Sequence, residues 1–219
     1  MIVAVFSDVH GNLPALNTFL AATRVIADQY LCLGDVVNYG PWNDECLEIV
    51  VALPGVRFIE GNHERLFLNA DAIELQQPLV REFYEHSSRN FSRRDLIRDL
   101  PTECELGSFE CRHTLGTART FRDSDVELER SFMIGHSHQQ FAIARNGYHL
   151  VNPGSVGQNR SNLAIAQYAL FNSGTESIEL CSIEYPYETL LGEMKARGYS
   201  ERCLQYCRSK LPRADGPHA

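Results

Sequence analysis

The chain opens with MIVAVFSDVHG (residues 1–11), an apolar run that gives way abruptly to polar residues. Residues 2–6 contain no polar side chain and are rich in β-branched residues, which predicts a strand buried on both faces, as in the sheets of α/β proteins. Asp8 and His10 follow the strand two positions apart. On an extended segment this spacing places both side chains on one side, where a carboxylate oxygen and an imidazole nitrogen can reach the same ion. We therefore expect a pair of metal ligands at a strand end; a helix cap and a solvated histidine are the alternative.

Two further expected strands in the first half of the chain end in the same way. Residues 30–33 are followed by Gly34-Asp35, and residues 56–60 are followed by the sequence GNHE at 61–64. Helical segments are expected between these strands, and the alternation of strand and helix favours a parallel sheet with right-handed crossovers. Polar residues at the ends of such strands lie where α/β proteins place their binding sites.

The second half of the chain combines a helical segment with further strands. Apolar residues recur at helical spacing over about residues 65–101, which predicts a helical insert lying over the site. Beyond it His113 follows one expected strand, the sequence GHSH at 135–138 follows another, and an Asn-Gly pair predicts a hairpin turn. Two C-terminal helices are expected at about 187–210.

Composition and charge narrow the class of protein. At 219 residues with 44% hydrophobic content the chain can bury one large core, and we interpret residues 1–219 as a single domain. The net charge of -8 argues against broad binding to nucleic acid or to an anionic membrane. No apolar run is long enough for a membrane span and no signal peptide is evident, so a cytoplasmic protein is expected. The seven cysteines lack a C-x-x-C pair and are interpreted as scattered thiols.

Residues able to bind metal gather at the expected strand ends. Five of the eight histidines, two aspartates and one asparagine occupy these positions. They are Asp8, His10, Asp35, Asn62, His63, His113, His136 and His138. They offer nitrogen and oxygen donors without a thiolate, a set that suits manganese, iron, zinc or cobalt. One ion cannot use so many ligands, whereas two metals about 4 Å apart with a shared carboxylate would use them and would serve displacement at phosphorus.

Taken together, these motifs resemble the calcineurin-like metallophosphoesterase superfamily. Its pattern is matched by DVH at 8–10, GD at 34–35, GNHE at 61–64, His113, and GHSH at 135–138. Two longer pieces resemble its small, single-domain prokaryotic-type branch, namely GDVVNYGP at 34–41 and NPGSVGQ at 152–158. The resemblance covers nearly the whole chain. It implies an α/β fold of four layers (α-β-β-α), in which two mixed β-sheets are flanked by helices.

The resemblance also implies a role for each of these residues. One metal would be bound by Asp8, His10 and His138, the other by Asn62, His113 and His136, and Asp35 would bridge the two. Asn62 and His63 would contact the phosphate, and His63 could protonate the leaving oxygen. The cofactors would be two divalent or trivalent metal ions, with manganese favoured and iron, zinc, cobalt or nickel as alternatives. They would activate a bridging hydroxide for attack at phosphorus.

One departure from the pattern concerns the contacts to phosphate. Asn38 and Tyr39 stand where protein phosphatases of the superfamily carry an acid and an arginine. The carboxylate expected to orient His63 is therefore missing, which argues against a protein phosphatase. Arg65 or Arg160 could supply the missing arginine by a bidentate contact, although each is also interpretable as a surface residue.

Two smaller departures are Thr114, which follows His113 in place of a glycine, and Glu64, which replaces an aspartate common among small relatives.

The complete ligand set predicts a dinuclear-metal phosphoesterase that hydrolyses a phosphomonoester or phosphodiester of a small molecule or nucleotide. The alternatives are a metal-binding scaffold for protein-protein interaction, a protein phosphatase, and a nuclease, which the acidic charge disfavours. The sequence does not specify an oligomeric state. Three further histidines are interpreted as surface or packing residues: His86, His149 and His218.

Overall fold

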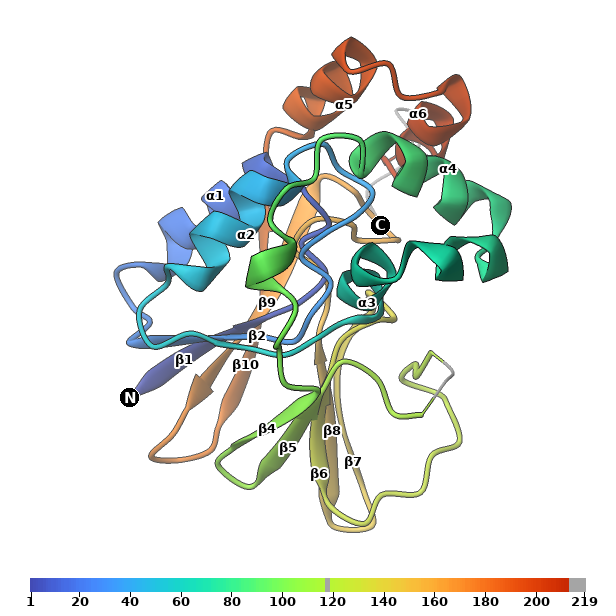
Figure 1. The fold of residues 1–219 in the computed structure, drawn as a ribbon. Coiled ribbons are helices and arrows are strands. Elements are labelled where there is room, and N and C mark those ends of the chain that lie inside the picture. Colours follow the sequence, from blue (N-terminus) through green and yellow to red (C-terminus); the bar gives the residue numbers. More distant parts are fainter. Residues whose placement is uncertain (117–118, 213–219) are drawn as a thin grey trace.

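Two five-stranded β-sheets form the centre of the protein in the computed structural model, which describes residues 1–116 and 119–212 (Figure 1). The strands of the first sheet are β1 (Ile2–Phe6), β2 (Gln29–Cys32), β3 (Arg57–Phe58), β9 (Ile165–Asn172) and β10 (Ile178–Glu184). Their order is β10-β9-β1-β2-β3. Strands β1, β2 and β3 run parallel, and β9 runs antiparallel to both of its neighbours.

The second sheet is also mixed, with the order β4-β5-β6-β8-β7. Its strands are β4 (Glu103–Leu106), β5 (Phe109–Arg112), β6 (Ser131–Ile134), β7 (Gln140–Arg145) and β8 (Tyr148–Pro153). Strands β5, β6 and β8 are parallel, so their carboxyl ends meet at one edge. The turn between β7 and β8 contains Asn146 at φ 52° and Gly147 at φ 82°, the left-handed pair that a two-residue hairpin requires. The hairpin predicted from the sequence is therefore confirmed.

Apolar side chains fill both faces of the first sheet. Helices α1 (Leu13–Thr23) and α2 (Asn43–Val51) cover its outer face. Buried residues there include Phe6, Phe19, Leu20, Cys32 and Leu47. The space between the two sheets is filled by residues such as Val5, Leu31, Cys111, Met133 and Phe171. Because residues 3–6 and 30–33 point alternately into these two cores, both stretches read as unbroken apolar runs.

The remaining helices gather at one end of the sheets, in the upper part of Figure 1. The insert comprises α3 (Asn62–Leu68), the 3-10 turns Ala70–Leu75 and Arg94–Leu96, and α4 (Pro78–Ser87). The two C-terminal helices are α5 (Tyr187–Ala196) and α6 (Glu201–Arg208). Helices α4, α5 and α6 share a small hydrophobic core with the loop after β2. This core includes Tyr39, Phe83, Leu190 and Leu204. The insert is thereby fixed over the strand ends.

The predicted α/β class and the two mixed sheets flanked by helices are confirmed. Two boundaries differ from the sequence expectation. The strand expected at 56–60 is only two residues long, because Glu60 N–H donates to Pro101 O at 2.7 Å instead of continuing along β2. The insert helix begins at Asn62 rather than near residue 65. His218 lies outside the described residues, and within them no helix is long and apolar enough to cross a membrane.

Candidate metal centre

The carboxyl ends of strands from both sheets meet beneath the insert. Asp8 and His10 follow β1, Asp35 follows β2, His113 follows β5, and His136 and His138 follow β6, while Asn62 and His63 start α3. Backbone hydrogen bonds join these loops to one another: Asp8 N–H donates to Gly34 O at 3.0 Å, and Gly135 N–H donates to His113 O at 3.0 Å. His136 N–H donates to Asp8 Oδ2 at 3.1 Å and so links the two sheets. All eight residues predicted from the sequence are brought to one place.

The backbone at these residues is in an unusual conformation. Left-handed φ angles occur at Asp8 (56°), His10 (51°), Asp35 (58°), His136 (65°) and His138 (58°). The extended segment expected for the Asp8-x-His10 pair is therefore wrong: the chain curls at both positions, and the curl brings the side chains together. Non-glycine residues in this region cost of order 1–3 kcal/mol each and concentrate at functional sites. The surrounding hydrogen bonds hold the strained backbone in place.

One group of ligand atoms comes from Asp8, His10 and His138. Asp8 Oδ1 lies 3.2 Å from His138 Nε2 and 3.7 Å from His10 Nε2. The Nε2 atoms of His10 and His138 are 3.2 Å apart. All three side chains are buried. Three donors this close together can bind a single ion.

A second group comes from Asp35, His113 and His136. Asp35 Oδ2 lies 3.1 Å from His113 Nε2, and Asn62 Oδ1 lies at the same distance from that nitrogen. The same Asp35 oxygen is 4.0 Å from His10 Nε2, which belongs to the first group. Asp35 Oδ2 therefore lies within 4.0 Å of a histidine nitrogen from each group.

Three of the histidines are oriented by backbone carbonyls. His10, His113 and His138 each place Nδ1 within hydrogen-bond distance of one carbonyl oxygen. The acceptors are Val37 O at 3.0 Å, Leu33 O at 2.7 Å and Gln158 O at 2.7 Å. A carbonyl can only accept, so Nδ1 carries the hydrogen, and the lone pair of a neutral ring is on Nε2. Each ring thus presents a ligand atom to the centre, in the way typical of metal-binding histidines.

The atoms at the centre are therefore acceptors that face other acceptors. The Nε2 atoms of His10 and His138, which both carry lone pairs, lie 3.2 Å apart. Asp8 Oδ1 and Asp35 Oδ2 are buried but accept no hydrogen bond. Buried polar atoms are normally satisfied, and leaving one unpaired costs about 1–3 kcal/mol. Cations satisfy such a cluster, and its nitrogen and oxygen donors fit divalent metals.

The electrostatics of the centre favour bound positive charge. Burial disfavours the ionised carboxylates, but the neighbouring histidines, led by His138 for Asp8 and by His113 for Asp35, lower both pKa values well below the usual range. Burial also opposes protonation of His113, yet the negative charge of the nearby Asp35 raises its pKa to about 10. Burial lowers the pKa of His136 to about 4. Fixed negative charge at Asp8 and Asp35 thus attracts a cation.

His63 lies at the edge of this cluster. Its backbone N–H donates to Asp35 Oδ1 at 2.9 Å, and its Nε2 lies 3.9 Å from Asp35 Oδ2. Its Nδ1 contacts Asn38 Nδ2 at 2.8 Å. Burial lowers the pKa of His63 to about 3. Asn38 thus contacts His63 from the position where protein phosphatases of the superfamily pattern carry an acid.

Of the two arginines considered for phosphate contact, Arg160 lies nearer to the cluster. Burial lowers the pKa of His138 and the charge of Arg160 adds a smaller lowering, while Arg160 Nε is buried without a hydrogen-bond partner. Arg65 instead pairs with Glu60 at 2.6 Å, with its side chain 66% exposed. Sequence reasoning missed Arg119, whose charge adds to the effect of burial in lowering the pKa of His136. Arg119 stands in an irregular segment without a motif, so no local signal marks it.

Comparison with known proteins identifies the class. Residues 1–176 match the family model of the calcineurin-like phosphoesterase superfamily domain. The chain therefore belongs to this superfamily of metal-dependent phosphoester hydrolases. An uncharacterized protein of Methanocaldococcus jannaschii is 28% identical over 214 residues, which cover 84% of this chain and 87% of the relative.

Two solved structures show the same fold. A metallophosphoesterase from Sphaerobacter thermophilus superposes with a TM-score of 0.78 at 22% identity, covering 96% of this chain and 100% of that chain. A hypothetical protein from Pyrococcus horikoshii gives a TM-score of 0.78 at 17% identity, covering 94% and 97%. At these levels of sequence identity, the two structures show that this chain shares their fold and no more than that.

Proposed function

We propose that residues 1–219 form one domain that hydrolyses phosphate esters of small molecules or nucleotides with two metal ions at its centre. The supporting observation is the position of Asp35, whose Oδ2 lies 3.1 Å from His113 Nε2 and 4.0 Å from His10 Nε2. When bound, two metals would neutralise phosphate oxygens and activate water for in-line attack. Manganese is the metal expected to support activity, with iron, zinc, cobalt or nickel as alternatives.

The ligands divide into two sets that share Asp35. The first metal would be held by Asp8, His10 and His138, and the second by Asn62, His113 and His136. Thr114 does not disturb the second set, because His113 Nδ1 lies 2.7 Å from Leu33 O and its Nε2 remains directed at Asp35. Both proposed ligand sets therefore consist of nitrogen and oxygen donors and include no thiolate.

Binding of the phosphate would fall to Asn62, His63 and the arginines around the cluster. His63 Nε2 faces the Asp35 carboxylate without reaching hydrogen-bond distance, so it can approach a substrate oxygen. Burial lowers the pKa of Arg119 and the nearby charge of Arg160 lowers it further, and both arginines lie within electrostatic reach of Tyr39. Charge-assisted contacts from such arginines are the strong ones in phosphate recognition. Arg65 contributes less, because it already pairs with Glu60.

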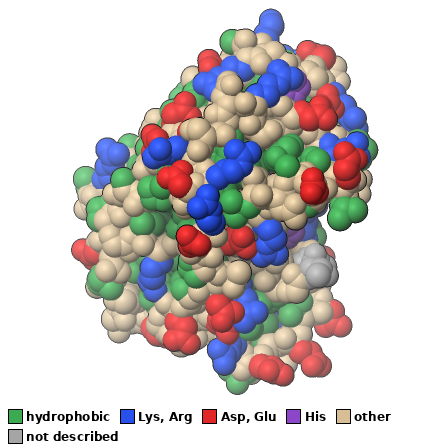
Figure 2. Space-filling model, viewed as in Figure 1, with side chains coloured by type: hydrophobic (Ala, Val, Ile, Leu, Met, Phe, Trp, Pro, Cys, Tyr) green, Lys and Arg blue, Asp and Glu red, His purple; other side chains and the backbone are tan. Residues whose placement is uncertain are grey.

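The surface and the cysteines support a small substrate and a reducing compartment. Figure 2 shows basic and acidic side chains interspersed over the visible face, without a continuous basic area there. Together with the net charge of -8, this favours a nucleotide or other small ester over a nucleic acid. All seven cysteines are free thiols. Free thiols agree with the cytoplasm as the site of action.

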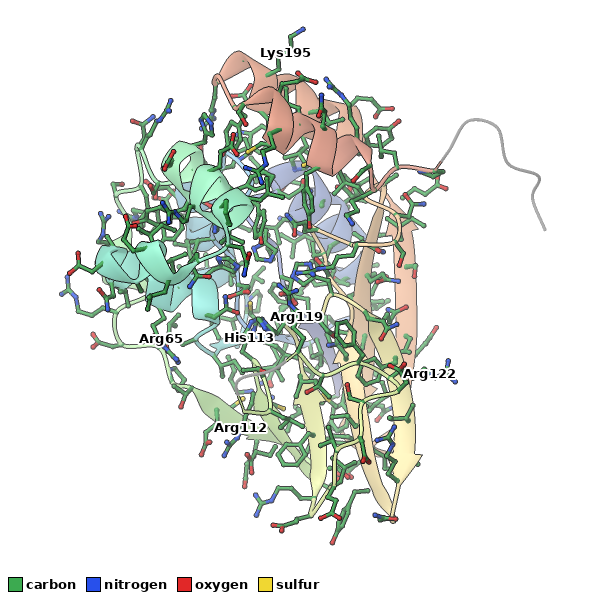
Figure 3. The ribbon with its side chains drawn as sticks, turned by 90° about the vertical axis from the view of Figure 1, so that its right-hand side faces the viewer. Arg65, Arg112, His113, Arg119, Arg122 and Lys195 are labelled. Carbon is green, nitrogen blue, oxygen red and sulfur yellow. The ribbon has the colours of Figure 1, made fainter. Side chains whose placement is uncertain are left out.

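Hydrolysis assays with matched variants test this function. Protein supplied with manganese should release phosphate or the chromogenic alcohol from an aryl phosphomonoester or an aryl phosphodiester. Asp35→Asn and His63→Asn should lose most of that activity. Lys195→Ala should keep it, because Lys195 lies at the far end of α5 from His113 (Figure 3). Equal activity in all four proteins would contradict the proposal.

A further inference from the structure

Asn38 connects His63 to the insert through a buried hydrogen-bond chain. Its side chain is fully buried, and its backbone is left-handed with φ 74°. Asn38 Oδ1 lies 2.8 Å from Tyr39 N and 2.9 Å from Ser87 Oγ, whereas Asn38 Nδ2 lies 2.8 Å from His63 Nδ1. The amide therefore lies between the last turn of α4 and the catalytic candidate His63.

The contacts decide which end of the amide is which. A backbone N–H can only donate, so the Asn38 atom next to Tyr39 N must be the oxygen. The Ser87 hydroxyl donates to the same oxygen. The other end of the amide is then the NH2 group, and it faces His63 Nδ1. Amide orientation is assigned from such networks, and here a backbone donor fixes it.

The tautomer of His63 follows from this orientation. An amide NH2 group has no lone pair to offer, so His63 Nδ1 must accept the hydrogen bond and carries no hydrogen. The ring hydrogen of neutral His63 is then on Nε2, which lies 3.9 Å from Asp35 Oδ2 and is not hydrogen-bonded to it. This hydrogen is directed toward the cluster. His10, His113 and His138 have the opposite arrangement, with Nδ1 facing a carbonyl.

A second asparagine holds the backbone of Asn38. Asn43 Oδ1 accepts from Asn38 N–H at 2.9 Å, and Asn43 Nδ2 donates to Ser87 O at 2.8 Å. Asn43 opens α2 and Ser87 closes α4, and both are buried. Asn38 is therefore held through its backbone by Asn43 on α2, and through its side-chain oxygen by Tyr39 N–H and by Ser87 on α4.

We propose that Asn38 is a positioning residue that fixes His63 as a hydrogen-bond donor through Nε2, so that His63 does not protonate the leaving group. This inference rests on the proposed function and replaces the proton donation that the sequence pattern suggested. If the neutral His63 ring gave up its Nε2 hydrogen, it would become an imidazolate anion. His63 instead donates a hydrogen bond to a phosphate or leaving oxygen, which departs as an anion and takes its proton from water.

The first test measures the tautomer and does not depend on activity. Long-range ¹H–¹⁵N correlation spectra of ¹⁵N-histidine-labelled protein, metal-free and loaded with diamagnetic zinc, report the protonated nitrogen of each ring, and the signals missing from His63→Asn assign residue 63. We expect a protonated Nε2 and a bare Nδ1 in the wild type. Asn38→Asp should shift the signal of Nδ1 to that of a protonated nitrogen, because a carboxylate can only accept. Ser87→Ala should leave the pattern unchanged, because Tyr39 N–H still fixes the amide.

The second test measures the dependence of the rate on the leaving group. Across a series of aryl and alkyl phosphate esters, kcat/KM of the wild type should fall steeply as the leaving alcohol becomes more basic. The slope should become shallower in Asn38→Asp, which can hold a proton on both nitrogens of His63. A wild-type ring protonated on Nδ1, or equal slopes in both proteins, would overturn the inference. A correct tautomer in a protein inactive toward every ester would contradict the proposed function and leave the assignment of Asn38 in place.

Discussion

Glu64 Oε2 accepts a hydrogen bond from the backbone N–H of Asp35 at 2.7 Å. The same carboxylate accepts from Val36 N and Val37 N at 2.7 and 3.2 Å, and from Gly61 N at 2.9 Å. Glu64 belongs to the first turn of α3 and is completely buried. One side chain therefore ties the start of α3 to the loop after β2 and holds the backbone of Asp35 in position.

Replacing Glu64 should cost both stability and metal binding. Glu64→Ala leaves four buried backbone N–H groups without an acceptor, so we expect a loss of about 3 kcal/mol or more in the free energy of unfolding. For a chain of this size such a loss lowers the melting temperature by roughly 10 °C. Glu74→Ala is the matched control, because that side chain is 75% exposed and should change stability by less than about 0.5 kcal/mol. Thermal unfolding of both variants decides whether the buried carboxylate has this role.

Gly61 should be essential for a steric reason. A Cβ at this position would collide with Asp35 Oδ1 and with Asp35 N. Gly61→Ala should therefore displace the shared carboxylate and reduce metal binding, measured by titration calorimetry with manganese. Gly192→Ala is the control, since nothing lies within 4 Å of a Cβ there. That helical substitution should be neutral or stabilise by about 0.4–1 kcal/mol, and equal metal affinity in both variants would show that residue 61 tolerates a side chain.

Metal binding should stabilise the fold. Acceptor atoms of Asp8, Asp35 and the histidines crowd the centre, and a cation that binds only the folded state raises the free energy of unfolding by about 2.7 kcal/mol at a hundredfold excess over its Kd. Melting curves with manganese and with a chelator should therefore differ by roughly 5–10 °C. The difference should shrink strongly in Asp35→Asn. A melting temperature indifferent to both additives would count against the centre.

Arg160 and Arg65 should differ in their effect on substrate binding. Arg160→Ala removes a charge that reaches His138 at the cluster, so KM for a phosphate ester should rise roughly tenfold. Arg65→Ala should change KM by less than about twofold, because its guanidinium pairs with Glu60 at an exposed position. Steady-state kinetics of the two variants compare them directly, and the reverse order would assign the phosphate contact to Arg65.

Much of this arrangement is predictable from local sequence. The apolar run at 2–6 becomes β1, and the Asn-Gly pair becomes the turn between β7 and β8, because strand burial and turn chemistry are local properties. The ligand residues could be placed at strand ends for the same reason. Their convergence depended on a resemblance, since spacing alone does not show which loops from two sheets meet.

Other features depend on contacts between distant segments. The curled backbone of Asp8 and His10 is held by bonds to residues after β2, so the extended spacing was a wrong expectation. The partner of His63 could not be read from Asn38 alone, because the orientation of the amide is set by Tyr39 N–H and by Ser87. Arg119 belongs to no sequence motif, so its electrostatic effect on His136 could not be predicted from local sequence.

Metal content per chain tests the central claim most directly. Protein purified without chelator and equilibrated with manganese should contain about two metal ions per chain by elemental analysis. Two ions are expected because each of the two ligand sets that share Asp35 would bind one. Asp35→Asn should reduce this content sharply, whereas Lys195→Ala should match the wild type. A wild-type content near zero, or an equal content in Asp35→Asn and the wild type, would contradict a two-metal centre built around Asp35.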